Sequence, residues 1–144
     1  MTRLPLSNGR SGERGHPLRV FVVEDHSDTR ELLCLLLEQM GHTVFAAATM
    51  AEALRRLPGA NCDVLISDIG LPDGDGWELL SRLSLPHPIY AIAISGRGAN
   101  GDRARSLAAG FRHHLTKPAG AEQLAPILDR AVRQLEGVCE APAA

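Results

Sequence analysis

Val64-Leu-Ile-Ser-Asp-Ile-Gly-Leu-Pro-Asp-Gly-Asp-Gly76 is the segment from which the architecture of this 144-residue chain can be worked out. It opens with a short apolar run of strand length, Val64 to Ile66, which places Asp68 at the carboxyl end of the strand. The loop over 70–76 is rich in Gly and Pro and leads into a helical pattern at about 77–83. The segment therefore predicts one β-α unit with an acidic residue at the strand end.

The same unit recurs along the rest of the chain. Apolar runs predict further strands at 20–23, 43–47, 89–94 and 114–116. Amphipathic stretches predict further helices from 27 or 28 to 40, at 50–57, at 102–109 and at 121–136. Ser27 or Asp28 is expected to cap the first helix, and Gly41 to end it. Thr49 is expected to cap the next helix, which Pro58-Gly59 would end.

Alternating β-α units predict an α/β fold, a doubly wound five-stranded parallel sheet with right-handed crossovers and helices on both faces. We expect one domain over 18–136, between a disordered leader at 1–17 and a flexible tail at 137–144. The net charge is only −2, and the short basic leader lacks the aromatic residues typical of nucleic-acid binding. No apolar run has the length of a membrane span, and the three cysteines lack metal-ligand spacing, so we expect reduced thiols in a cytoplasmic protein.

Polar side chains stand at the predicted carboxyl ends of four strands. These are Glu24-Asp25, Asp68, Ser95-Gly96 and Lys117-Pro118. In a parallel sheet these ends meet at one edge, where ligands bind. Three neighbouring carboxylates repel one another, and a hard cation such as Mg²⁺ relieves the repulsion. Lys117, the only lysine in the chain, adds a compact positive charge beside a carboxylate that can form an aspartyl phosphate.

Each of these residues, taken alone, could have a purely structural role. Glu24-Asp25 could be acids favoured at a helix N-terminus, Asp68 a residue that starts a turn, and Ser95-Gly96 an ordinary turn. Trp77 is interpreted as a packing residue on its helix. The joint occurrence at one sheet edge favours a functional site.

With these residues in order, the chain resembles the receiver domain of bacterial two-component response regulators over about 18–136. The resemblance is carried by Glu24-Asp25, Asp68 with Leu71-Pro72, Asp75-Gly76, Ser95-Gly96 and Lys117-Pro118. Their spacings are 43 residues from Asp25 to Asp68, 27 to Ser95 and 22 to Lys117. The resemblance implies a chemotaxis-regulator-like, flavodoxin-like fold with strand order 2-1-3-4-5.

The resemblance also implies roles for single residues. Asp68 would be the phosphoacceptor, with Ser95 and Lys117 contacting the phosphoryl group and with Ile69 and Gly96 as further phosphate-binding positions. Mg²⁺ would be bound by Asp25, Asp68 and the Gly70 carbonyl directly, and by Glu24 through water. Lys117-Pro118 would be a cis peptide. Gly70 and Arg97 would tune the lifetime of the phosphoryl group.

Switching would pass through Ser95 and His114 to an output surface formed by 102–109, 114–116 and 121–136. His114 stands where the family often has an aromatic residue, and we expect its protonation at mildly acidic pH to weaken the active state. Two departures concern the last helix: Ala119-Gly120 replaces the usual Asp-type cap, and Pro126 falls in its interior.

The implied partners are a histidine kinase or a histidine phosphotransfer protein, and a downstream protein, with a homodimer left open. Neither nucleic acid nor membrane is expected as a partner. We expect a stand-alone receiver that promotes only its own phosphorylation and dephosphorylation, although 98–117 also resembles receivers of hybrid kinases. The alternatives are a phosphorylation-independent adaptor and a Mg²⁺-dependent phosphohydrolase, the latter disfavoured by Gly70 where one hydrolase type needs Asp.

Overall fold

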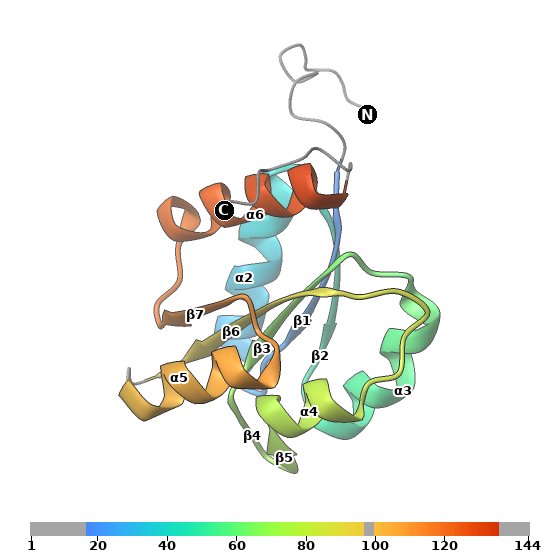
Figure 1. Cartoon of the computed structure of the whole chain (residues 1–144). Helices are drawn as coiled ribbons and strands as arrows, with labels where there is room; N and C mark the ends of the chain where they lie inside the picture. The colour runs from blue at the N-terminus through green and yellow to red at the C-terminus, as the bar shows by residue number, and fades with distance from the viewer. Residues whose placement is uncertain (1–16, 97–99, 136–144) are drawn as a thin grey trace.

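The computed structural model describes residues 17–96 and 100–135, which form alternating strands and helices (Figure 1). The strands are β1 (Arg19–Val23), β2 (Thr43–Ala47), β3 (Val64–Asp68), β4 (Gly70–Leu71), β5 (Gly74–Asp75), β6 (Tyr90–Ser95) and β7 (His113–Thr116). The helices are α2 (Ser27–Gln39), α3 (Met50–Ala60), α4 (Gly76–Arg82), α5 (Asn100–Ala109) and α6 (Ala121–Leu135). The predicted leader, apart from Pro17, and the predicted tail lie outside the described residues.

The five longer strands form one parallel sheet in the order β2-β1-β3-β6-β7. Numbered among themselves, these strands have the order 2-1-3-4-5, which confirms the predicted doubly wound fold. The short antiparallel pair β4–β5 lies in the loop after Asp68, where the sequence indicated only a loop. The strand order reverses between β1 and β3, so the crevice expected of such sheets lies at the carboxyl ends of these two strands.

Alternate side chains of the central strands enter two separate cores, one on each face of the sheet. Figure 1 shows α2 and α6 on one side of the sheet and α3, α4 and α5 on the other. Val20, Val22 and Ile92 pack with α2 and α6, whereas Phe21 and Val23 pack with α3 and α4. A strand buried on both faces needs no polar alternation, which is why the sequence runs are continuously apolar.

Helix α2 begins one residue earlier than its predicted caps require. The side chain of His26, not Ser27 or Asp28, accepts the N–H of Thr29 at the helix start. The N–H of His26 in turn donates to Glu24 Oε2 at 3.0 Å, which fixes His26 in the extended conformation of an N-cap. This contact depends on how Glu24 is buried, which the local sequence does not reveal.

Helix α3 continues through Pro58 and Gly59 to Ala60, so the predicted end was wrong. Asn61, in a left-handed conformation with φ of 57°, ends the helix. The guanidinium of Arg19, on β1, donates to the carbonyls of Ala60 and Asn61. A contact with a residue about forty positions away therefore satisfies the last turn that Pro58 was expected to end.

Helix α6 also contains its proline, Pro126, without interruption. An interior proline costs roughly 3 kcal/mol, but burial of a leucine stabilises by about 1.5–3 kcal/mol. Leu124 and Leu128 are both buried against the sheet, so their packing offsets the proline. At the start of the helix Gln123 Oε1 accepts the N–H of Gly120, which supplies part of the capping that the missing Asp would give.

Two further sequence expectations concern the whole chain. Among the described residues, no helix has both the length and the apolar character needed to cross a bilayer. Cys34 and Cys62 are free thiols, and burial raises the pKa of Cys62 to about 11, so this thiol stays protonated. Cys139 lies outside the described residues.

Candidate functional site

Three carboxylates gather where the central strands end. Glu24 and Asp25 follow β1, and Asp68 ends the neighbouring β3, with Val23 paired to Ser67 in register. One oxygen from each of Glu24, Asp25 and Asp68 lies within 4.8 Å of the others. Glu24 is fully buried and Asp68 nearly so, whereas Asp25 is exposed. The predicted convergence of these acids is therefore present in the fold.

Lys117 completes the cluster from the other side. Its Nζ lies 2.8 Å from Asp68 Oδ2 and 2.9 Å from Glu24 Oε1. The Lys117 N–H donates to the carbonyl of Ser95, so the two adjacent strand ends, β6 and β7, hold the residue in place. The Lys117-Pro118 peptide is cis, as the resemblance implied. One ammonium thus neutralises part of the charge of three carboxylates.

The pKa shifts at this site indicate a pocket that attracts positive charge. Burial raises the pKa of Glu24, and the hydrogen bonds from Lys117 and from the His26 N–H only partly oppose this. Burial alone would lower the pKa of Lys117, but its hydrogen bonds to Asp68 and Glu24 outweigh burial and raise it. Both groups therefore retain protons more strongly than in water. An all-oxygen donor set with surplus negative charge is the kind that suits Mg²⁺.

Two backbone N–H groups follow Asp68 directly and have different partners. The N–H of Ile69 donates to the Ile94 carbonyl at 3.0 Å inside the sheet, so it is not directed at the carboxylate. The N–H of Gly70 does contact it, at 3.2 Å from Asp68 Oδ1. In this structure the Ile69 N–H is therefore engaged within the sheet, and the Gly70 N–H is the backbone donor in contact with the carboxylate.

The glycines near the acidic cluster differ in how much space surrounds them. Gly70 and Gly96 are both exposed, and a Cβ added to either would meet no atom within 4 Å, so the space around them is open. Gly76 is the opposite case, since its added Cβ would lie 2.8 Å from the carbonyl oxygen of Asp68. The start of α4 therefore packs directly on the segment that carries Asp68. Arg97 lies outside the described residues.

Arg30 is a site residue that the sequence reasoning missed. Its guanidinium donates to the carbonyls of Glu24 and Asp25, at 2.9 and 3.3 Å. It thereby holds the backbone that presents both acids, from the first turn of α2. An arginine placed five or six positions after an acidic pair on a new helix is the only sequence signal, and it is a weak one.

His114 lies inward beneath Ser95 and is almost completely buried. Its Nε2 lies 3.0 Å from Ser95 Oγ, which places the two predicted switch residues in contact. Burial lowers the pKa of His114, and Arg103 lowers it further against a smaller opposing effect of Asp102. Protonation of the His114 imidazole therefore requires a lower pH than it would for an ordinary histidine.

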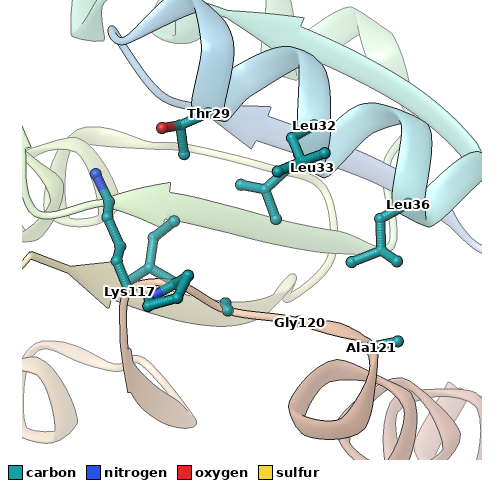
Figure 2. A pocket seen from close by; sticks show the side chains of 10 residues that line it. Thr29, Leu32, Leu33, Leu36, Lys117, Gly120 and Ala121 are labelled. Atoms are coloured by element: carbon teal, nitrogen blue, oxygen red, sulfur yellow. The ribbon is translucent and has the colours of Figure 1, made fainter.

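A groove of about 360 Å³ runs from Lys117 along α2. Figure 2 shows Leu33 and Leu36 of α2 directed toward the segment from Lys117 to Ala121, with Thr29 nearest the lysine. The lining is mainly apolar, and Leu32 at its margin is 67% exposed. An apolar trough therefore leads to the end of the site where Lys117 lies.

Comparison with known proteins identifies the family to which this sequence is similar. The family model of the response regulator receiver domain matches residues 20–129. A curated relative, an uncharacterized 14.6 kDa protein from Leptolyngbya boryana, is 39% identical over 102 residues, which cover 69% of this chain and 78% of the relative. The KDP operon transcriptional regulatory protein KdpE of Escherichia coli is 36% identical over 115 residues, 80% of this chain.

Solved structures agree with these matches. A CheY-like response regulator receiver domain protein from Methanospirillum hungatei has a TM-score of 0.77 at 26% identity, covering 84% of this chain and 98% of that one. The beryllofluoride-activated NtrC4 receiver domain dimer has a TM-score of 0.74 at 26% identity, covering 81% and 97%.

This chain spans about half the length of the transcriptional regulators it matches, since 51% of KdpE is covered. The shared part is thus the receiver, a signalling module, and no relative favours the adaptor or the phosphohydrolase. The strand order, the acids with their lysine and the family match agree, and the chain belongs to the receiver domains of two-component response regulators.

Proposed function

We propose that Asp68 accepts a phosphoryl group from a phosphohistidine on a histidine kinase or a histidine phosphotransfer protein. In this transfer the phosphorus–nitrogen bond breaks, and its electron pair stays on the donor imidazole. A phosphorus–oxygen bond forms to a carboxylate oxygen of Asp68. The observation that carries the proposal is the position of Lys117, 2.8 Å from Asp68 in a cluster of three acids. The protein thereby promotes its own phosphorylation and, with water as acceptor, its dephosphorylation.

Lys117 supports this role because its ammonium group can pair first with the Asp68 carboxylate and then with the phosphoryl group. Before phosphorylation its ammonium is paired with Asp68 and Glu24. Once Asp68 carries a phosphoryl group, the carboxylate charge moves outward onto phosphoryl oxygens, and the ammonium follows as a charge-assisted donor. The Ser95 hydroxyl, on the adjacent strand end, would make a second contact with the group. Gly70, with open space around it, and Arg97 would set how easily water attacks the phosphorus.

Mg²⁺ would be held by Asp25, Asp68 and the Gly70 carbonyl, with Glu24 acting through water. When bound, the cation supplies positive charge to the oxygens of the transferring group. Asp25 is exposed, and its carboxylate pairs with none of the described residues, so it can turn to a ligand. Glu24 is already engaged, with Oε1 near Lys117 and Oε2 accepting the His26 N–H.

The phosphodonor would dock on the groove beside α2 (Figure 2). A donor histidine must reach Asp68 from solvent, and the groove begins at Lys117, which touches Asp68. Leu32, which lines the groove and is exposed, offers an apolar margin suited to a helical partner. The downstream partner or a second copy would use the surface formed by α5, β7 and α6. Such phosphotransfer would take place in the cytoplasm, which is consistent with the free thiols Cys34 and Cys62.

Phosphorylation by a small phosphodonor tests the proposal. The full chain is incubated with acetyl phosphate, with Mg²⁺ or with excess chelator, and its intact mass is measured. We expect close to one phosphoryl group per chain with Mg²⁺ and only background labelling without it. Labelling that is equal in both conditions would contradict the cation site. Absence of labelling in both would contradict the phosphoacceptor function.

Two carboxylate variants test the assignment of the cation ligands. We expect Asp25→Asn to weaken Mg²⁺ binding at least about tenfold, which corresponds to about 1.4 kcal/mol of lost direct coordination. Glu24→Gln should weaken binding less, because Glu24 is engaged with Lys117 and His26. Calorimetric Mg²⁺ titration measures both, with the exposed, first-turn Asp28→Asn as the matched control. A larger loss in Glu24→Gln than in Asp25→Asn would reverse the assignment.

A further inference from the structure

A buried chain of hydrogen bonds runs from α4 to the end of β6. Trp77 Nε1 donates to Ser106 Oγ at 2.9 Å, and Ser106 Oγ lies 2.7 Å from His114 Nδ1. His114 Nε2 lies 3.0 Å from Ser95 Oγ. Ser95, Ser106 and His114 are all buried, so these groups are shielded from water. This series of hydrogen bonds joins four elements, α4, α5, β7 and β6, whose residues are distant in sequence.

The direction of each hydrogen bond in this series follows from its first donor, the indole N–H of Trp77. The indole N–H of Trp77 can only donate, so Ser106 Oγ must accept there. Ser106 is fully buried, and its side-chain partners in the described structure are Trp77 and His114. The remaining Ser106 hydrogen therefore has one acceptor, His114 Nδ1, since a buried hydroxyl left unpaired is costly.

We propose that Trp77 and Ser106 are positioning residues that hold His114 as the neutral tautomer protonated on Nε2, and so direct Ser95 toward the phosphoryl group. With Nδ1 accepting, the imidazole proton lies on Nε2 and is donated to Ser95 Oγ. The hydroxyl hydrogen of Ser95 is then donated to an acceptor other than His114. A phosphoryl oxygen on Asp68 is such an acceptor, and this last step rests on the proposed function.

The opposite tautomer would work against phosphorylation. With the proton on Nδ1, the imidazole Nε2 would accept the Ser95 hydrogen and compete with the phosphoryl group for it. A doubly protonated imidazole would leave the buried Ser106 hydrogen without its acceptor. Among the described residues, only the tautomer protonated on Nε2 gives the buried Ser106 hydrogen its acceptor while His114 donates to Ser95.

The arrangement also ties α4 to the phosphorylation site at two points. Gly76, at the start of α4, packs against the Asp68 carbonyl, and the adjacent Trp77 begins the hydrogen-bond chain. The guanidinium of Arg105 lies over the Trp77 ring, 3.9 Å from its centroid, in a cation–π contact that does not use the indole N–H. Arg105 thus provides a control that separates ring packing from hydrogen donation.

The tautomer is measured directly by the imidazole ¹⁵N chemical shifts of the full, unphosphorylated chain, assigned by comparison with His114→Phe. We expect His114 of the wild type to carry its proton on Nε2. Trp77→Phe removes the N–H, so Ser106 can accept from Nδ1, and we expect a mixture of tautomers. Arg105→Gln keeps the indole N–H and should leave the wild-type tautomer unchanged.

The second readout is the rate of phosphorylation by acetyl phosphate with Mg²⁺. Trp77→Phe should slow it in proportion to the fraction of the Nε2-protonated tautomer that is lost, about twofold for an even mixture, whereas Arg105→Gln should not slow it. A wild-type His114 protonated on Nδ1 overturns the inference, whether or not the variants fold. A tautomer that is unchanged in Trp77→Phe overturns the role of Trp77.

The proposed phosphoacceptor function and the proposed tautomer of His114 are tested by different outcomes. A wild-type protein that takes no phosphoryl group contradicts the proposed function and the role of Ser95, even if the tautomer is the one expected. A protein that is phosphorylated normally with the other tautomer contradicts only this inference.

Discussion

Asp68→Asn should abolish phosphorylation of the chain by acetyl phosphate in the presence of Mg²⁺. The amide cannot act as the nucleophile that a carboxylate oxygen provides, so the reaction loses its acceptor and not merely a contact. Intact-mass measurement gives the stoichiometry, and peptide mapping locates any label. The variant should still fold, since Asp68 lies at a strand end and the apolar part of β3 is unchanged.

Asp129→Asn is the matched control for this experiment. Asp129 is exposed on α6 and belongs to no part of the acidic cluster. It should be labelled as fully as the wild type. Stoichiometric labelling of Asp68→Asn, or a label mapped to Asp25, would show that another carboxylate is the acceptor.

Lys117→Arg should retain the fold and Mg²⁺ binding but lose the conformational response to phosphorylation. The lysine Nζ contacts Asp68 and the fully buried Glu24 within 3 Å, and this space fits a compact ammonium. A guanidinium is wider and planar, so it cannot keep both contacts and then follow the phosphoryl oxygens. Loss of such a charge-assisted contact is worth about 1.5–3 kcal/mol, roughly ten- to a hundredfold in the switching equilibrium.

Amide chemical shifts of β6 and β7, recorded with and without the phosphoryl mimic beryllofluoride, measure this response. The wild type should show large changes at Ser95 and Gly96, and Lys117→Arg should show changes near background. Arg133→Lys, an exposed exchange of the same two residue types on α6, should respond as the wild type does. Wild-type shifts in Lys117→Arg would show that any cation suffices at this position.

Much of the fold could be predicted because its signals are local. The continuous apolar strands and the turn residues between them define the β-α order, and the family resemblance supplied the strand order, which was confirmed. The errors lie at helix ends, where tertiary packing decides which side chains reach the terminal backbone groups. Arg19 extends α3 past Pro58, and buried Glu24 fixes His26 as the cap of α2. Neither contact leaves a trace in the neighbouring sequence.

The candidate site divides in the same way. Glu24, Asp25, Asp68, Ser95 and Lys117 could be selected from the sequence, because the carboxyl ends of parallel strands must meet at one edge. What surrounds them could not. The backbone donor of Ile69 is consumed by the sheet, and Arg30 reaches back to the carbonyls of the acidic pair.

The succession of strands and helices along the chain, and the residues at the strand ends, were already contained in the amino-acid sequence, since the periodicity that marks each element acts over short distances. The protonation and orientation of His114 were not. They depend on Ser106 and Trp77, which approach it only when α4 and α5 pack on the same face of the sheet. A buried hydrogen-bond chain is defined by distances of about 3 Å between elements, and only packing in three dimensions sets those distances.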